Sequence, residues 1–417
     1  MMINEFMKVY RLKITAYSPV HIGDSRDLEP TEYVICKDAA KASAAKEAPA
    51  FVICPECHTK NPVNARYCGV CDTPLPQIKP TAAHNQSAPQ NDAFLYTYTP
   101  KQLSEALSLT DKQQLLRIVK SGSDGALKEL QKFFRARAAF IAKHADKRSK
   151  VCPEIAKKYE KAETENRFRI EKQISDAASG LPYIPGSSLK GAIRTALMSQ
   201  KNKMMYLNSR DVQKGADAEK MLYGYGNPTD DPFKALKLGD AVVKNPLMTN
   251  ICVATNVKRR RNVVSNGNLT TFMEVIPPEN VFESSLAFSF GTNAAERFNE
   301  SIQSIKAACN KFYGAILDEQ AKYQTEIHDI DDALFNDIKA AMQKPNAFLL
   351  CLGKHGGAES KTMEGLRKIK ILTGKDKETG KKNPPKFLDH ATTYWFADDG
   401  RQKLPFGWCV VEFEEVK

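Results

Sequence analysis

The chain has 417 residues, of which 42% are apolar and 26% charged, and its net charge is +12 at pH 7. This length and apolar content are typical of a globular protein with two or three domains and exclude a chain that is disordered throughout. The basic balance indicates a polyanionic partner, most commonly a nucleic acid, although many basic proteins carry such charge only for solubility.

The start of the chain, MMINEFMKVYRLKI, lacks the apolar run and the small-residue cleavage site of a signal peptide. No stretch approaches the roughly 20 apolar residues that a membrane-spanning helix needs. The ten cysteines do not indicate a disulfide scaffold, because such scaffolds are typical of short secreted chains. We therefore expect a soluble protein in a reducing cytoplasm.

Residues 8–16 alternate between apolar and polar side chains, which predicts a half-buried first strand. A turn follows in the motif Ser18-Pro-Val-His-Ile-Gly23, and a second apolar stretch spans 33–36. A cysteine-rich module at 51–76 comes next and ends in a stretch rich in Pro, Asn and Gln. The composition of its flanks predicts that the module is an insertion with its own linkers.

Two Cys-x-x-Cys pairs in this module predict a metal site whose ligands are Cys54, Cys57, Cys68 and Cys71. Each pair turns two thiolates toward one ion, and the ten residues between the pairs allow a short hairpin to bring the pairs together. Four thiolates fill a tetrahedral shell and leave no position for water or substrate. The expected ion is therefore structural Zn²⁺, with a redox pair or a chance spacing as the alternatives.

The pattern from 99 to 179 is helical, and apolar residues of its best segment recur at spacings of three and four between 127 and 141. The polar face of this region is strongly basic and carries few acids before Glu154. Its cations are Lys132, Arg135, Arg137, Lys143, Lys147, Arg148 and Lys150. Such a face fits a phosphate backbone, but a solvated helical surface explains the pattern equally well.

A strand-to-helix turn follows at Pro185-Gly186, with Ser187 or Ser188 as the predicted N-cap. Lys190 and Arg194 lie one turn apart on the same face of the helix, just beyond backbone amides that could receive a phosphate. The apolar face consists of Leu189, Ile193, Ala196 and Leu197. An ordinary capped helix is an equally good reading, and the spacing is not that of a Walker loop.

Strands return in the second half of the chain, before and after a long helical stretch from 294 to about 343. They are expected at 272–276, 284–290, 347–352 and 407–413. Two groups of strands with helices between them predict an α+β protein rather than one doubly wound sheet. We place its two domains at 1–230 and 231–417.

Two further features fit a nucleic-acid partner. One is the basic run of Lys258, Arg259, Arg260 and Arg261, which precedes a polar turn and would place four cations at the tip of a hairpin. A solvated charge cluster explains this run nearly as well. The other feature is a set of tyrosines that could stack on bases, although aromatic residues in such segments more often belong to the core: Tyr183, Tyr223 and Tyr225.

Two motifs together resemble the signature pair of the RAMP superfamily of CRISPR-Cas proteins. They are Ser18-Pro-Val-His-Ile-Gly23 and Ile184-Pro-Gly-Ser-Ser-Leu-Lys-Gly-Ala-Ile-Arg194. Three added segments most resemble the family of Csm subunit five from type III-A effector complexes: Pro30-Thr-Glu-Tyr-Val-Ile35, Asp231-Pro-Phe-Lys-Ala-Leu236 and Leu404-Pro-Phe-Gly-Trp408. The resemblance runs from about Val9 to Trp408, and the cysteine module is an insertion that the family does not require.

The resemblance implies two ferredoxin-like, RRM-related domains with helical insertions and an inserted four-cysteine zinc ribbon. It also implies a non-catalytic subunit that binds crRNA, caps its 3′ end region and supports crRNA maturation in antiviral defence. The implied partners are the crRNA, the backbone and small Csm-type subunits, the target RNA through the crRNA, and a host nuclease that trims the crRNA.

Carried over to this chain, the resemblance puts three segments on the RNA-facing side. They are the turn around His21, the helix start at 186–194 and the glycine-rich loop Gly353–Gly357, which departs from the usual RAMP pattern but offers cations to phosphate. With the basic run at 258–261, the expected RNA contacts are His21, Ile22, Gly23, Arg26, Gly186, Ser187, Ser188, Lys190, Arg194, Lys354 and His355.

Two other classes of function stay open on the sequence. A RAMP endoribonuclease or backbone subunit would cut precursor or target RNA, with His21, Asp24, Asp27 and His355 as candidates; such cleavage needs two titratable groups to converge, which a sequence does not show. A freestanding zinc-dependent nucleic-acid-binding adaptor would use the cysteine module itself. Lys60 and Arg66 are the only cations in that loop, too few for a strong phosphate contact.

Overall fold

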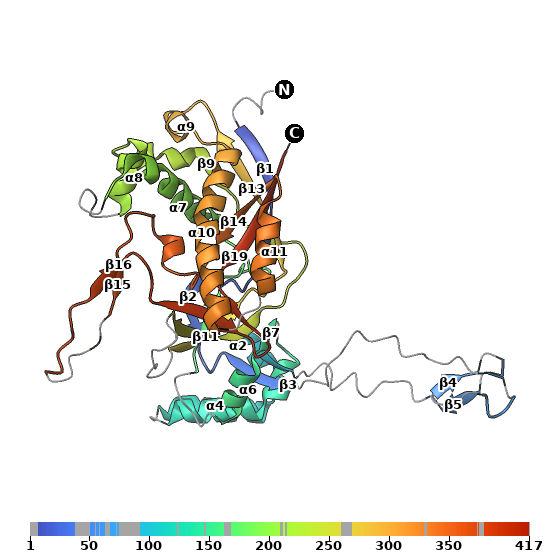
Figure 1. Ribbon diagram of the computed structural model, residues 1–417. Helices are drawn as coiled ribbons and strands as arrows, with labels where there is room; N and C mark the ends of the chain where they lie inside the picture. The colour runs from blue at the N-terminus through green and yellow to red at the C-terminus, as the bar shows by residue number, and fades with distance from the viewer. Residues whose placement is uncertain are drawn as a thin grey trace. The chain divides into compact units, whose positions relative to one another are not determined.

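Figure 1 shows the computed structural model of the protein. The structure describes residues 7–37, 51–54, 56–57, 59–62, 67–71, 73–74, 92–122, 125–145, 147–161, 168–208, 212, 215–259, 269–328, 332–372, 374 and 379–416. The chain divides into two compact units. The first comprises Met1–Glu29, Cys152–Lys158 and Asn166–Lys417, and the second comprises Pro30–Val151 and Tyr159–Glu165.

The first sheet of the first unit joins strands from both ends of the chain. Its order is β10-β13-β1-β19-β14, with β9 (Leu236–Leu238) also paired to β13. The bounds are β10 Val242–Val243, β13 Val281–Ser289, β1 Met7–Ala16, β19 Trp408–Glu415 and β14 Ala347–Cys351. Strand β1 pairs with both β13 and β19, so strands from both ends of the chain share one sheet. The limits of the two compact units therefore do not coincide with the domain boundary predicted at 230/231.

The alternation predicted for the first strand is confirmed. Tyr10, Leu12, Ile14 and Ala16 are at most 4% exposed, while the residues between them are exposed or half-buried. This apolar face belongs to the main core, which also contains the fully buried Trp408, Phe282 and Phe348. A pleated strand presents alternate residues to one face, so the period of two already places this strand over a core.

A second sheet of the same unit contains β2, β8, β12 and β11 in that order, followed by β17 and β18. The bounds are β2 Gly23–Leu28, β8 Ile170–Gln173, β12 Thr270–Val275, β11 Asn250–Lys258, β17 Thr393–Asp398 and β18 Lys403–Pro405. Strands β8 and β12 are parallel, whereas β2 and β8 are antiparallel. This pairing places the turn after β1 next to a strand from near residue 170.

Helices of the first unit cover the first sheet. They are α7 (Gly186–Met205), α8 (Gly215–Tyr223), α9 (Asn293–Phe298), α10 (Ile302–His328) and α11 (Asp332–Met342), with the short 3-10 turns η1 Pro228–Asp230, η2 Pro232–Ala235 and η3 Glu359–Lys361. The long α10 packs against both α7 and β14 (Figure 1). The helical stretch predicted from 294 to 343 is therefore three helices. A two-stranded hairpin, β15 (Ile369–Ile371) and β16 (Lys386–Leu388), completes the unit.

The second unit contains an antiparallel sheet of β3 (Tyr33–Lys37), β6 (Ala93–Thr97) and β7 (Lys147–Val151). Four helices pack with it: α2 Pro100–Ala106, α3 Leu109–Ser121, α4 Ala126–Ala136 and α5 Ala138–Ala142. The helix α6 (Pro153–Lys161) starts in the first unit and ends in the second. A short hairpin of β4 (Phe51–Ile53) and β5 (Lys60–Pro62) flanks the first cysteine pair.

The α+β class is confirmed, but the helical prediction over 99–179 is wrong at two segments. Lys147–Val151 and Ile170–Gln173 are the strands β7 and β8. Both are short, and their pairing with strands remote in the sequence decides their conformation, which a local helical pattern does not reveal. Among the helices that the structure describes, none has both the length and the apolar run needed to cross a bilayer.

Candidate functional site

The turn after β1 is held inside the first unit by His21. This side chain is 1% exposed, and its Nδ1 lies 2.6 Å from the carbonyl oxygen of Glu274. Because a carbonyl oxygen only accepts, Nδ1 carries the proton of this hydrogen bond. Burial lowers the pKa of His21, so the ring is neutral at pH 7. Its Nε2 lies 3.7 Å from Oε2 of Glu171.

The glycine-rich loop Gly353–Gly357 lies directly against this turn. The backbone amide of Lys354 donates to the carbonyl oxygen of His21 over 2.7 Å. Gly353 has φ +76°, and a Cβ there would lie 2.2 Å from the same oxygen, so no other residue fits. Nζ of Lys354 lies 2.6 Å from Oε2 of Glu171. The structure thus joins two of the three segments predicted to face RNA.

His355 does not offer a cation to phosphate. Its ring stacks on Trp395 with centroids 4.0 Å apart, and its Nε2 is buried without a hydrogen-bond partner among the described residues. Burial, followed by repulsion from Lys354, lowers the pKa of His355 to about 3. Lys361, which follows the loop, is exposed as a whole residue, although partial burial of its amino group lowers its pKa. Lys354 is therefore the exposed cation of this loop.

The rest of the turn is partly structural and partly open. The amide of Ile22 donates to Oε1 of Gln173 over 2.8 Å, and its carbonyl accepts from the amide of Ile174. Gly23 begins β2. Arg26 is the exposed member, with a side chain 73% exposed and 3.4 Å from Oδ2 of Asp24. Among the predicted contacts here, Arg26 is free to reach an external phosphate.

Helix α7 begins at Gly186, with Pro185 as its N-cap and no side-chain cap. The prediction that Ser187 or Ser188 caps the helix is wrong, because both lie inside its first turn. The amide of Gly186 donates to Oδ1 of Asp240 over 2.7 Å, so an internal carboxylate takes an amide predicted for phosphate. A Cβ at Gly186 would lie 2.4 Å from the carbonyl oxygen of Leu238. Close packing therefore explains this glycine.

Arg194 and Lys190, on the first turns of α7, differ in their surroundings. The guanidinium of Arg194 contacts Glu219, with Nε 2.8 Å from Oε2, and lies 3.2 Å from Oδ2 of Asp231. It also stacks over the ring of Phe233. Lys190 is half-buried and has no such pair with a described residue; burial lowers its pKa. The apolar face predicted for this helix is buried as expected.

The basic run after β11 is also partly internal. Arg259 is 8% exposed and contacts Glu359 and Glu319, with Nη to carboxylate distances of 2.6 and 3.1 Å. Its guanidinium lies over the ring of Tyr394. Lys258 is half-buried at the end of the strand, and Arg260 and Arg261 lie outside the described residues. Arg259 therefore has a structural partner at a site predicted for RNA.

The basic face of the second unit also contains both cations with internal partners and exposed cations. Arg137 contacts Asp111 over 2.5 Å, Arg135 lies over the ring of Tyr159, and Lys150 lies 3.4 Å from Asp92. Lys132 and Lys143 are exposed. Of the tyrosines considered for stacking, Tyr223 is 4% exposed and Tyr225 donates to Glu219, so both have structural roles.

The four cysteines of the module come together, as their spacing predicts. The Sγ atoms of Cys54, Cys57, Cys68 and Cys71 all lie within 4.8 Å of one another. Three of their separations are 3.5, 3.5 and 3.3 Å, near the roughly 3.8 Å between thiolates around a tetrahedral zinc ion. The cluster can bind a metal with four sulfur ligands.

A threonine lies two residues after each cysteine pair. The prediction of the metal site from the spacing of the cysteines does not include these threonines. Thr59 Oγ1 lies 3.3 Å from Cys57 Sγ, and Thr73 Oγ1 lies 3.1 Å from Cys71 Sγ. The carbonyls of both threonines accept from the amides of Cys54 and Cys68, each over 2.9 Å. The two halves of the cluster are therefore built alike, as Cys-x-x-Cys-x-Thr. Hydroxyls in these positions can orient the thiolates of a bound metal.

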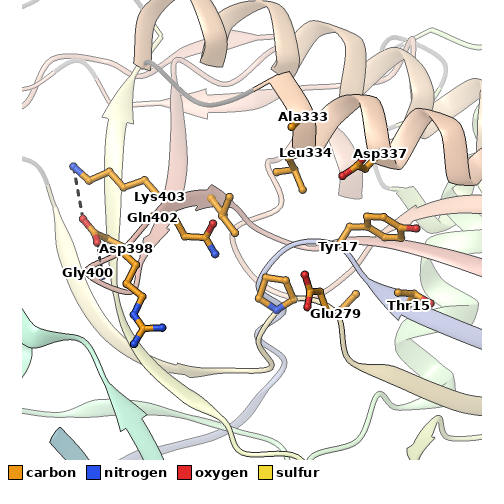
Figure 2. A pocket seen from close by; sticks show the side chains of 14 residues that line it. Thr15, Tyr17, Glu279, Ala333, Leu334, Asp337, Asp398, Gly400, Gln402 and Lys403 are labelled. Atoms are coloured by element: carbon orange, nitrogen blue, oxygen red, sulfur yellow. Dashed lines mark hydrogen bonds and ion pairs between the residues drawn. The ribbon is translucent and has the colours of Figure 1, made fainter. Parts of the chain in front are cut away.

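A cavity of about 870 Å³ in the first unit lies apart from these residues (Figure 2). Tyr17, Glu279, Asp337 and Gln402 surround its open space, and Lys403 is 3.6 Å from Asp398 at one side. None of the predicted site residues that the structure describes lines it. Its lining carries both signs of charge and does not favour a polyanion.

Comparison with known proteins gives a family and a fold. A family model of the RAMP superfamily matches residues 13–316. A chain in the "Cryo-EM structure of Csm-crRNA-target RNA ternary complex in type III-A CRISPR-Cas system" is 15% identical, with a TM-score of 0.54, and the match covers 97% of this chain and 100% of that one. The crystal structure of T. onnurineus Csm5 is 14% identical, with coverages of 82% and 89% and a TM-score of 0.46. No curated protein matches the chain.

Proposed function

Because the chain belongs to the RAMP superfamily, we propose that it is a crRNA-binding subunit of a Csm-type, type III CRISPR-Cas effector complex. One observation carries this proposal: the turn around His21 and the glycine-rich loop, both assigned to the RNA-facing side, lie against each other through the bond from the Lys354 amide to the His21 carbonyl. This junction presents Lys354 and Arg26 to solvent. Exposed cations on a rigid turn suit a phosphate backbone.

The position in the complex belongs to the same proposal. The solved chain with a TM-score of 0.54 shares the fold, and its structure is that of a complex with crRNA and target RNA. We place this protein at the 3′ end region of the crRNA, where it caps the guide, contacts backbone and small subunits, and supports maturation by a trimming nuclease. The mostly antiparallel sheets with packed helices support the proposal of ferredoxin-like domains.

Binding of this kind does not read sequence. Lysine and arginine side chains and backbone amides hold phosphates, while the bases stay free to pair with a target. Lys354 would exchange its contact with Glu171 for a phosphate oxygen. The affinity for RNA should then fall steeply as salt rises, because each phosphate contact releases counterions.

The same proposal makes the subunit non-catalytic. An acid-base pair for RNA cleavage needs groups that reach a 2′-hydroxyl and a leaving oxygen. His21 is 1% exposed and uses Nδ1 internally, and Asp24 accepts from the amide of Arg26 over 2.9 Å. Labelled precursor and target RNA, incubated with wild type, Asp24→Ala and Asp27→Ala, should stay intact in all three cases. Cleavage by wild type that either variant abolishes would establish the endoribonuclease alternative.

We also propose that the cysteine cluster holds structural Zn²⁺. Four thiolates fit a closed tetrahedral site, and a bound ion would supply the cross-link that lets a short segment fold without a core of its own. The sulfur-to-sulfur separations and the paired threonine contacts support this assignment. A freestanding zinc adaptor would instead bind nucleic acid through the module.

The decisive experiment isolates the complex through a tag on this subunit and sequences the bound RNA. The proposal expects co-purified Csm-type subunits and RNAs that share a repeat-derived 5′ tag and end at defined 3′ positions. Isolation of the protein without RNA or partners would refute it. RNA bound by the isolated cysteine module alone would support the adaptor function instead.

A further inference from the structure

The cations assigned to phosphate from the sequence largely hold the protein's own carboxylates. Arg194 contacts Glu219 and Asp231, Arg259 contacts Glu359, and Lys354 contacts Glu171. A second cavity of the first unit, with a volume of about 750 Å³, differs in this respect. Three cations line it, and none of them is among the residues predicted from the sequence to contact RNA.

These cations are Lys234, Lys237 and Arg297. Within the described part of the chain, none of the three forms an ion pair with a carboxylate. Lys234 donates to the carbonyl of Thr229 over 2.8 Å, and Arg297 donates to the carbonyl of Gly224 over 3.3 Å. The positive charge of the cavity is therefore not neutralised by these contacts.

The cavity has a rigid frame. Asp231 accepts from the amide of Phe233 over 2.9 Å and thereby caps η2, which carries Lys234. Strand β9 carries Lys237 and pairs with β13 from Leu236 to Leu238. Helix α9 packs on η2, where the rings of Phe233 and Phe298 lie 5.1 Å apart, next to Arg297. Two core aromatics thus hold the segments that bear the three cations.

The rest of the lining narrows the class of ligand. Apart from one acid, Asp230, and one alanine, the lining consists of hydroxyl and amide side chains: Thr229, Ser289, Thr292 and Asn293. No aromatic ring of the described residues lines the cavity, so it offers no surface on which a base would stack. Arginine forms two parallel bonds to phosphate, and lysine adds a point charge. Hydroxyls and an amide can complete the hydrogen bonds of phosphate oxygens.

A neighbouring side chain responds to this charge. Burial lowers the pKa of Lys190, attraction to Asp231 opposes this effect, and repulsion by Lys237 adds to it. Lys237 therefore acts electrostatically on the start of α7, although the attraction to Asp231 is the larger of the two charge effects on Lys190. An anion in the cavity would relieve this repulsion.

We propose that the cavity formed by Lys234, Lys237 and Arg297 binds phosphate groups. The ligand chemistry has two sources, an RNA backbone or a free nucleotide. Binding of phosphates of an RNA backbone at this cavity rests on the proposed function, whereas binding of a free nucleotide does not. The site adds contacts that the motif pair does not include.

The test uses the full chain and the double variant Lys237→Ala/Arg297→Ala. Binding of labelled single-stranded RNA is measured by fluorescence anisotropy over a salt series, and inorganic phosphate and AMP are titrated by calorimetry. We expect at least tenfold weaker RNA binding at low salt. The slope of log affinity against log salt should fall by about 1.4, since each phosphate contact on a single strand contributes about 0.7. The matched control is Lys244→Ala, whose side chain is 76% exposed and 3.8 Å from Glu283 outside the cavity.

The arms of the experiment separate the possible failures. Equal RNA affinity and equal phosphate or AMP binding in wild type and double variant would overturn the phosphate site, while RNA binding by wild type would leave the proposed function intact. Wild type that binds no RNA but binds AMP through these residues would overturn the proposed function and support the nucleotide source. A variant Lys237→Glu, checked for native circular dichroism, should weaken RNA binding further; unchanged binding would also count against the site.

Discussion

Arg194 shows at the level of single residues why a motif does not by itself assign a role. The sequence places Arg194 one turn from Lys190, in the pattern of two cations that await a phosphate. The structure gives its guanidinium two carboxylates and an aromatic ring. A charge already paired in this way contributes to the fold, whereas the half-buried Lys190 forms no ion pair with a described residue.

Replacement of Arg194 should therefore act on stability. Arg194→Ala leaves the buried Glu219 and the half-buried Asp231 without their cation, and we expect a loss of about 1–3 kcal/mol in the free energy of unfolding. Urea denaturation measures this loss. The control Arg11→Ala removes an arginine that is 65% exposed beside Glu414 and should change stability by less than about 0.5 kcal/mol. Equal losses in both variants would contradict the structural role.

His355 should make stability depend on pH. Its folded-state pKa is lowered to about 3, so below pH 6.5 the unfolded chain binds a proton that the folded chain does not. The contribution of the neutral His355 to the free energy of unfolding should thus be fully present above pH 6.5. It should decrease as the pH falls toward 3, by at most about 1.4 kcal/mol per pH unit for this one group. His355→Asn tolerates the φ of +68° and should flatten the dependence measured by urea denaturation at pH 7.5, 6.5 and 5.5. Parallel curves for both proteins would argue against this cause.

At the level of elements, the glycine-rich loop depends on its fit to the turn after β1. Lys354, which the proposed function uses, is positioned because Gly353 lets the backbone approach His21. The loop and the turn lie far apart in the chain, and their contact forms only when β14 and β1 flank β19 in one sheet. The presentation of Lys354 is therefore a property of this sheet.

Gly353→Ala should disturb both stability and RNA binding. A Cβ would lie 2.2 Å from the His21 carbonyl oxygen, in addition to the strain of φ +76°. Gly374→Ala is the matched control, because Gly374 has φ +80° but no atom of the described residues lies within 4 Å of a Cβ placed there. We expect the control to lose about 1 kcal/mol from backbone strain and Gly353→Ala to lose clearly more, with weaker RNA binding. Urea denaturation measures the loss of stability, and fluorescence anisotropy measures the RNA affinity. Equal effects of Gly353→Ala and Gly374→Ala on both would show that the contact with His21 has no role.

At the level of the whole molecule, the cysteine cluster and the junction proposed to face RNA belong to different compact units. The cysteines lie in the second unit, and His21 and Lys354 lie in the first. Each unit has its own hydrophobic cluster. Loss of metal should therefore affect the fold of the module without removing the residues proposed to hold RNA.

Removal of zinc tests this separation. Cys71→Ser should lower the zinc content of the purified protein from about one ion to near zero, because one thiolate of the closed site is lost. RNA affinity should stay within about twofold of wild type, as measured by anisotropy together with metal analysis. Thr73→Val keeps all four thiolates and serves as the milder comparison, with about 10–100-fold weaker metal binding. Loss of RNA binding in step with loss of zinc would favour the adaptor function.

The sequence by itself determined the features whose signal is local. The alternation in β1, the apolar face of α7, the cysteine spacing and the motif pair all follow from neighbours within a few residues, because strand and helix periods and metal-ligand turns act at that range. Only the tertiary structure decided which cations are paired. The partners of Arg194, Arg259 and Lys354 lie 37, 100 and 183 residues away, so no local pattern could distinguish an internal ion pair from a free phosphate contact.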